Sequence, residues 1–212
     1  MRTRRSFAEG SATAGYGSGM PAVCVYCAAR HGAKESYTSA ARHVGATFAG
    51  RGWDLVYGGG RVGLMGEVAD AALAGGSHVT GVITTHLLGL EVGHDAVSEL
   101  VVVADMAERK REMFQRSDAF VILPGGIGTL EELFEIWCWS SLGLHAKPLV
   151  LVNVDGYFDQ LVGFLRHSID VGLFTDPGLD LATVVVSAHE AAEVISAAFA
   201  DESNHSAGGR PP

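Results

Sequence analysis

Residues 119–133 read AFVILPGGIGTLEEL, and this segment decides the class of fold. It opens with a continuous apolar run, which is typical of a strand buried on both faces of a parallel sheet. A Pro-Gly-Gly-x-Gly loop follows at 124–128, and the apolar residues after the loop recur at helical spacing. The segment therefore predicts a strand, a glycine loop and a helix over 129–142 in direct succession.

The same alternation of apolar strands and helical patterns extends in both directions from this segment. We expect strands at residues 22–28, 53–57, 78–83, 99–103, 119–123, 149–152 and 183–186. We expect helices at 37–49, 64–74, 106–116, 129–142, 157–171 and 188–199, and an irregular stretch at 84–98. Strands that alternate with helices predict an α/β, Rossmann-like three-layer fold, with a mostly parallel sheet and helices on both faces.

Length and composition set the domain organisation and exclude several classes of protein. The 212 residues are 48% hydrophobic and 18% charged, which suits a single globular domain over 21–200. We expect a disordered lead-in at 1–20, which is rich in Gly, Ser and Ala over 11–19, and a disordered polar tail at 201–212. The net charge of −9 argues against nucleic acid and anionic membranes as partners, and no apolar run is long enough to span a bilayer. We therefore expect a cytoplasmic protein.

The cysteines and histidines do not form a recognisable metal or redox site. Cys24 and Cys27 lie in one apolar strand, where side chains three positions apart point to opposite faces of the sheet. We interpret them as two separately packed thiols rather than as a zinc or redox pair. The nine histidines are scattered without a His-x-x-x-His spacing, so the sequence predicts no metal site.

A glycine loop nearer the N-terminus, GGGRVG at 58–63, lies between a predicted strand and a predicted helix. It matches the dinucleotide pattern G-x-G-x-x-G, in which backbone N–H groups at a helix N-terminus bind a phosphate. That pattern also requires an acidic residue about 20 positions later, and GVITT at 81–85 has none. NAD is therefore disfavoured, while a phosphate-binding loop and a tightly packed turn both stay open.

The loop at 124–129 can bind an anion in the same way, and Thr129 adds a hydroxyl. No Gly-Lys-Ser/Thr follows, so the loop is not of the Walker type and ATP hydrolysis is disfavoured. Glu132 has two interpretations. Thr129-x-x-Glu132 has the spacing of a capping box, in which both side chains only satisfy backbone donors at a helix start. The alternative is a catalytic carboxylate, for which Glu131 is a neighbouring candidate.

Three ordered motifs resemble the Lonely Guy (LOG) family of cytokinin riboside 5′-monophosphate phosphoribohydrolases, which are often mislabelled as lysine decarboxylases. The motifs are GGGRVGLMG at 58–66, Met-x-x-Arg-Lys at 106–110 and PGGIGTLEE at 124–132, and the resemblance covers about 23–171. It implies a Rossmann-like fold, a homodimer and no bound cofactor. It also implies hydrolysis of the N-glycosidic bond of a nucleoside 5′-monophosphate, either AMP or an N6-modified AMP, to the free base and ribose 5-phosphate.

The resemblance further implies which residues form the site. Arg109 and Glu132 correspond to the family's catalytic pair. The implied substrate-binding residues are Glu91, Arg109, Lys110, Gly126, Ile127, Gly128, Thr129, Leu130, Glu131 and Glu132, together with Gly59, Gly60 and Met65. Without the family, Arg109 would be interpreted as a solvated side chain on the charged helix face at 108–112.

Two positions depart from the family's usual pattern. CAAR at 27–30 replaces the usual Cys-Gly-Ser-Ser, so that Arg30 can supply charge to a phosphate in place of the missing hydroxyls. Cys138 stands where a threonine is common in the Trp-containing helix, so a substrate-contacting hydroxyl is lost. That helix is apolar nearly all round over 130–144, which favours a homodimer interface.

Glu132 suits the implied reaction, because cleavage of an N-glycosidic bond gives the sugar oxocarbenium character that a nearby carboxylate stabilises. The main alternative is a carrier that binds a nucleotide or cofactor through the same loops without turnover, as the related molybdenum-cofactor carriers suggest. A decarboxylase is least favoured, because that chemistry generally needs a lysine that holds pyridoxal phosphate.

Overall fold

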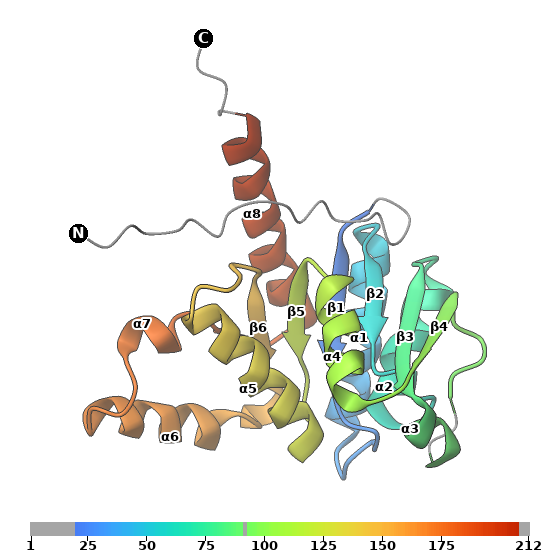
Figure 1. Ribbon diagram of the computed structural model, residues 1–212, viewed down its shortest axis with the longest axis horizontal. Helices are drawn as coiled ribbons and strands as arrows, with labels where there is room; N and C mark the ends of the chain where they lie inside the picture. The colour runs from blue at the N-terminus through green and yellow to red at the C-terminus, as the bar shows by residue number, and fades with distance from the viewer. Residues whose placement is uncertain (1–19, 91–92, 208–212) are drawn as a thin grey trace.

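The computed structural model describes residues 20–90 and 93–207 as an α/β fold built on one seven-stranded sheet (Figure 1). The strands are β1 (Ala22–Tyr26), β2 (Asp54–Tyr57), β3 (Val79–Thr84), β4 (Glu99–Val103), β5 (Ala119–Ile122), β6 (Leu149–Val152) and β7 (Thr183–Val185). Their order in the sheet is β4-β3-β2-β1-β5-β6-β7, and every neighbouring pair is parallel. The predicted fold class is therefore confirmed.

The strand order reverses at β1, which pairs with β2 on one side and with β5 on the other. The chain builds one half of the sheet from β1 outward to β4, and then returns to build β5, β6 and β7 on the other half. At such a reversal the loops after neighbouring strands diverge, and a crevice forms outside the carboxyl ends of the strands. The loops after β1, β2 and β5 begin at this edge, and they carry the motifs at 27–30, 58–66 and 124–132.

Helices cover both faces of the sheet. The helices on one face are α1 (Glu35–Gly50), α2 (Gly63–Ala74) and α8 (Ala188–Ala207), and those on the other are α4 (Met106–Gln115), α5 (Ile127–Ser141) and α6 (Asp159–Asp170). The short helices α3 (Thr85–Leu90) and α7 (Asp176–Leu179) and the 3-10 turn η1 (Val154–Gly156) lie in connections. Figure 1 shows α4 and α5 in front of the strands and α8 extending past the end of the sheet.

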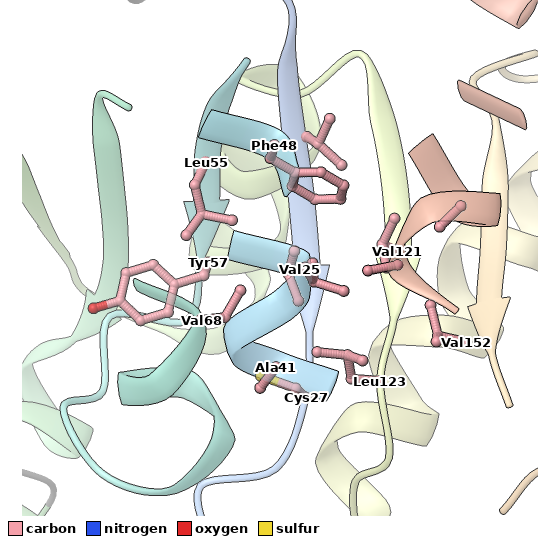
Figure 2. Close-up of a cluster of buried hydrophobic side chains, with 14 of the residues drawn as sticks. Val25, Cys27, Ala41, Phe48, Leu55, Tyr57, Val68, Val121, Leu123 and Val152 are labelled. Carbon is pink, nitrogen blue, oxygen red and sulfur yellow. The ribbon is translucent and has the colours of Figure 1, made fainter. Parts of the chain in front are cut away.

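The apolar core lies in two layers, one on each face of the sheet. Figure 2 shows the layer beneath α1 and α2, where Val25 and Leu55 of the strands lie in one apolar cluster with Phe48 of α1. Cys27 belongs to this layer, whereas Cys24 belongs to the layer beneath α4 and α5. Both cysteines are buried and free, so the prediction of two separately packed thiols is confirmed.

The predicted irregular stretch at 84–98 is wrong in part, because it contains α3. The Thr84 hydroxyl accepts a hydrogen bond from the Leu87 N–H at 3.1 Å and so caps a helix that is too short to show apolar periodicity. α7 was not predicted either, and here the Thr175 hydroxyl accepts from the Gly178 N–H at 3.2 Å. Local side-chain caps, rather than apolar spacing, define both short helices.

Several predicted helix ends also shift, and α1 begins at Glu35 rather than at 37. α5 begins at Ile127, before the predicted start at 129. α6 begins at Asp159 rather than at 157, because the Asn153 side chain accepts from the Phe158 N–H at 2.7 Å and prolongs the preceding turn. α8 continues past 199, so the tail that we expected to be disordered from 201 is helical as far as Ala207. The remaining parts of the two expected disordered ends lie outside the described residues.

α1 packs closely against α2 at Gly45, which has no side chain to separate the two helices. A Cβ at Gly45 would lie 2.3 Å from the carbonyl oxygen of Val68 and 2.9 Å from the backbone nitrogen of Ala72. α2 starts directly from the glycine loop that follows β2, so this contact also holds that loop against the rest of the layer.

We predict that Gly45→Ala destabilises the protein by about 1–3 kcal/mol, because the added methyl group overpacks the contact between α1 and α2. The measurement is the free energy of unfolding from urea denaturation followed by circular dichroism. Gly163→Ala in α6 is the matched control, since a Cβ there meets no heavy atom within 4 Å. This control should stabilise the protein by up to about 1 kcal/mol. Equal effects of the two substitutions would contradict the packing explanation.

Candidate active site

A cavity of about 390 Å³ opens at the carboxyl edge of the sheet, beside the reversal of strand order. Its walls come from the loop after β1 and from the helices α2, α3, α4 and α5. The lining residues are Cys27, Ala28, Ala29, Arg30, Met65, Leu87, Met106, Arg109, Gly126, Gly128, Thr129 and Glu132. Segments that are far apart in the sequence thus converge where this type of fold binds its ligands.

Arg109 lines this cavity from α4 but is only 6% exposed. Its guanidinium donates to three acceptors: Nε to the Val82 carbonyl at 2.9 Å, Nη2 to the Gly58 carbonyl at 2.9 Å and Nη1 to Glu132 Oε1 at 3.1 Å. The interpretation of Arg109 as a solvated side chain is therefore wrong. A guanidinium has five N–H donors, so two remain available to a ligand in the cavity.

The glycines of the first loop make room for Arg109 and for the loop after β1. A Cβ at Gly58 would lie 2.2 Å from Nη2 of Arg109 and 2.9 Å from the sulfur of Met65. Gly63 has φ +69°, and a Cβ there would lie 2.1 Å from the backbone nitrogen of Arg30. These close approaches explain why the loop holds more glycines than a turn requires.

Glu132 faces Arg109 from α5. Because α5 begins at Ile127 with Gly126 as its N-cap, Thr129 lies inside the helix and the capping-box interpretation of Glu132 is wrong. Burial raises the pKa of Glu132 to about 7, and the nearby charge of Arg109 opposes this shift only in part. A carboxyl group with this pKa exchanges a proton near neutral pH, which suits general acid–base chemistry.

Lys110 forms two further ion pairs beside the Arg109–Glu132 pair. Lys110 Nζ contacts the carboxylate of Glu131 and, at 3.0 Å, that of Glu135. Lys110 does not belong to the cavity lining; its ammonium group bridges α4 to α5. Since Arg109 and Glu132 are the sequence neighbours of Lys110 and Glu131, this bridge supports the alignment of the buried pair.

The start of α5 presents backbone N–H groups to the cavity. Gly126 and Gly128 are exposed, and a Cβ at either position would meet no heavy atom within 4 Å, so the space beside them is open. Gly125 is different, because a Cβ there would lie 2.1 Å from the hydroxyl oxygen of Thr129. An open helix N-terminus with free N–H groups attracts anions, so this loop has the geometry of a phosphate site.

The residues that the sequence analysis assigned to the site divide into three groups. Those that line the cavity are Met65, Arg109, Gly126, Gly128, Thr129 and Glu132. Those that the structure places outside the lining are Gly59, Gly60, Lys110, Ile127, Leu130 and Glu131. Glu91 lies outside the described residues. The assignment missed the apolar wall formed by Leu87 and Met106, and Leu87 could not be found without predicting α3.

Gly59 and Gly60 do not line the cavity but connect the first glycine loop to the segment before β4. Gly59 has φ +76°, and its carbonyl accepts a hydrogen bond from the His94 N–H at 3.0 Å. Gly60 forms an antiparallel bridge with Gly93. These contacts fix the position of the first glycine loop. They therefore also help to position the neighbouring Gly58 carbonyl, which accepts a hydrogen bond from Arg109.

The ionisable side chains that line the cavity are Cys27, Arg30, Arg109 and Glu132. Over residues 20–90 and 93–207, no group of three or more His, Cys, Asp or Glu side chains is placed to hold a metal ion. Among the helices in this described part of the chain, none has the length and apolar character needed to cross a bilayer.

The parallel sheet, the reversal at β1 and the cavity at the carboxyl edge define a Rossmann-like α/β protein with a cavity at its switch point. Solved structures share this fold. The Moco carrier protein of Chlamydomonas reinhardtii matches with a TM-score of 0.65 and 22% identity, covering 86% of this chain and 99% of that one. The molybdenum cofactor binding protein of Rippkaea orientalis matches with a TM-score of 0.63 and 22% identity, covering 85% and 98%.

Sequence comparison then identifies the family. Residues 65–195 match the family described as "Possible lysine decarboxylase". A probable cytokinin riboside 5′-monophosphate phosphoribohydrolase of Oryza sativa subsp. japonica is 50% identical over 173 residues, covering 79% of this chain and 76% of that protein. A cytokinin riboside 5′-monophosphate phosphoribohydrolase of Arabidopsis thaliana is 44% identical over 173 residues, covering 82% and 79%. The chain belongs to the Lonely Guy family, and the resemblance of its motifs is confirmed.

The raised pKa of Glu132 predicts how stability depends on pH. The ordinary value is 4.5 and the value in the folded protein is about 7, so folding favours the protonated carboxyl group. This contribution is complete below pH 4.5 and is lost as the pH rises through 7. The loss is on the order of 3 kcal/mol, because one pKa unit corresponds to about 1.4 kcal/mol.

The measurement is the free energy of unfolding in urea across this pH range, for the unchanged protein and for Glu132→Gln. The amide does not titrate, so the difference between the two proteins should change with pH in the direction given. A difference that stays constant with pH would show that burial does not raise the pKa of Glu132.

Proposed function

We propose that the protein is a phosphoribohydrolase that cleaves the N-glycosidic bond of a purine nucleoside 5′-monophosphate, either AMP or a cytokinin-type, N6-modified AMP. The products are the free base and ribose 5-phosphate. The observation that carries the proposal is the buried Arg109–Glu132 pair in a cavity bordered by the open start of α5. The relatives of 44–50% identity described above are named for this reaction.

In this proposal the 5′-phosphate binds at the start of α5. The N–H groups of residues 127–129 have no acceptors within the helix, because they belong to its first turn. A phosphate held there leaves the ribose to extend toward Glu132 and the base to lie near the apolar Met106 and Leu87. Binding energy gained at the phosphate, remote from the bond that breaks, positions the anomeric carbon for reaction.

The chemical step breaks the bond between C1′ and the base nitrogen, and the bonding electrons leave with the base. The ionised carboxylate of Glu132 stabilises the positive charge that develops on the sugar. It also accepts a proton from the water whose oxygen bonds to C1′, and then gives this proton up to the departing base, so that the carboxylate is restored. The two remaining N–H groups of Arg109 donate to the substrate and hold it against Glu132.

We expect the purified protein to release base and ribose 5-phosphate from AMP or from isopentenyl-AMP, measured by chromatography. Glu132→Gln should lower kcat about 100- to 10,000-fold, because it removes the group that exchanges the proton. Glu193→Gln is the matched control, since Glu193 is an exposed glutamate on α8, outside the cavity lining and on the other face of the sheet from α5, and should leave kcat within a few-fold. Normal turnover by Glu132→Gln would refute this role of the glutamate.

The same assay separates hydrolysis from the alternative function of a carrier. Binding of a purine monophosphate without release of base from any of them would favour a carrier and contradict the proposed reaction. Turnover of AMP and isopentenyl-AMP measured side by side decides which base the apolar wall accepts.

We also propose that two copies of the chain form a homodimer through α5 and the segment that follows it. Phe134 on α5 is 40% exposed, and Leu142 and Leu144 beyond its end are 67% and 68% exposed. An apolar groove of about 240 Å³, lined in part by Phe134, Trp137 and Phe174, lies alongside. Exposed apolar surface of this kind supports a subunit interface.

Sedimentation velocity tests the homodimer. The double substitution Leu142→Asp and Leu144→Asp should convert a dimer into a monomer, because it places charges in the apolar interface. Val186→Asp is the control, since Val186 is 68% exposed but lines a separate cavity with residues of α1 and α8, on the face of the sheet opposite α5. A dimer that survives the double substitution would place the interface elsewhere.

We further propose a cytoplasmic location. Cys24, Cys27 and Cys138 are all free, which suits a reducing compartment. The net charge of −9 argues against a nucleic acid as a partner.

A further inference from the structure

Arg30 lines the same cavity as Arg109 and Glu132, but its environment is different. Arg109 is buried and holds three acceptors, whereas Arg30 is exposed and makes no ion pair or side-chain hydrogen bond with the described part of the chain. The neighbouring basic residues are already engaged, His31 with Glu67 at 3.1 Å and Lys34 with Asp155 at 3.3 Å.

The backbone of the loop after β1 is held firmly next to both glycine loops. The Ala28 N–H donates to the Pro124 carbonyl at 3.2 Å, and the Met65 N–H donates to the Ala28 carbonyl at 3.2 Å. Gly63 packs directly against the backbone nitrogen of Arg30. Because Pro124 opens the loop that leads to α5, the turn that carries Arg30 lies beside the open start of that helix.

We propose that Arg30 binds the 5′-phosphate of the substrate, from the side of the cavity formed by the loop after β1. This inference rests on the proposed function and adds a residue to its phosphate site. The backbone N–H groups of α5 supply only partial charges, and the protein as a whole is negative, so a dianion gains most from a full positive charge at the same place.

The guanidinium group suits this role for two reasons. Its planar set of N–H donors matches two phosphate oxygens at once, which an ammonium group does not. Since Arg30 has no carboxylate partner in the described residues, it does not have to break an ion pair before it binds the phosphate. Ala28 and Ala29, which precede Arg30 in the loop, have no side-chain hydroxyl that could donate a hydrogen bond to the phosphate in its place.

The test compares Arg30→Ala and Arg30→Lys with the unchanged protein on two substrates, a purine nucleoside 5′-monophosphate and the same nucleoside without its phosphate. Arg30→Ala should lower kcat/KM for the monophosphate about 10- to 100-fold, the range expected for losing a charge-assisted hydrogen bond. Activity on the nucleoside should not change, and Arg30→Lys should recover part of the loss. Arg166→Ala, which removes an exposed arginine from α6, should match the unchanged protein on both substrates.

Calorimetric binding of ribose 5-phosphate keeps this inference separate from the proposed reaction. If ribose 5-phosphate binds and Arg30→Ala weakens that binding about 10- to 100-fold, the role of Arg30 stands even where no monophosphate is hydrolysed. If Arg30→Ala leaves this binding unchanged, or lowers activity equally on the monophosphate and the nucleoside, Arg30 does not bind the phosphate.

Discussion

Burying the guanidinium of Arg109 requires acceptors for its N–H groups inside the protein, because an uncompensated charge in the interior is very costly. The acceptors come from three separate elements: the Gly58 carbonyl after β2, the Val82 carbonyl in β3 and the Glu132 carboxylate in α5. All three meet at the carboxyl edge of the sheet, so Arg109 is held only when β2, β3 and α5 are correctly placed. The same burial raises the pKa of Glu132, so one packing arrangement both fixes the Arg109 side chain in place and shifts the pKa of the carboxyl group that faces it.

Most of the fold was predictable because each strand is a short apolar run between polar or glycine-rich segments. Residues 119–123 and the other apolar runs form strands, and along the chain these strands alternate with helices as predicted. α3 and α7 were not predictable in this way, since they depend on single hydroxyl caps from Thr84 and Thr175 rather than on a repeating pattern. The parallel direction of every strand pair follows from the intervening helices, but the reversal at β1 could be seen only in three dimensions.

Six of the thirteen residues that the sequence assigned to the candidate site line the cavity, and spacing alone did not indicate what each of them contacts. Glu132 has the same spacing from Thr129 whether it caps a helix or lines a cavity, and the start of α5 at Ile127 separates the two interpretations. Spacing also carries no information about the contact between Gly58 and Arg109, which lie 51 positions apart. Lys110, adjacent to Arg109 in the motif, bridges two helices outside the cavity, so adjacency in a motif does not guarantee a shared role.

The space left by the absent side chain of Gly58 affects how mutational data on this protein should be interpreted. A random screen for loss of function would recover changes at Gly58 alongside those at Glu132, although Gly58 does not line the cavity. A methyl group there displaces Arg109, and every larger residue displaces it further. Intolerance to substitution at Gly58 therefore reflects the space that the Arg109 side chain occupies. Ligand contacts inferred from mutational tolerance alone would wrongly include residues such as Gly58, which do not line the cavity.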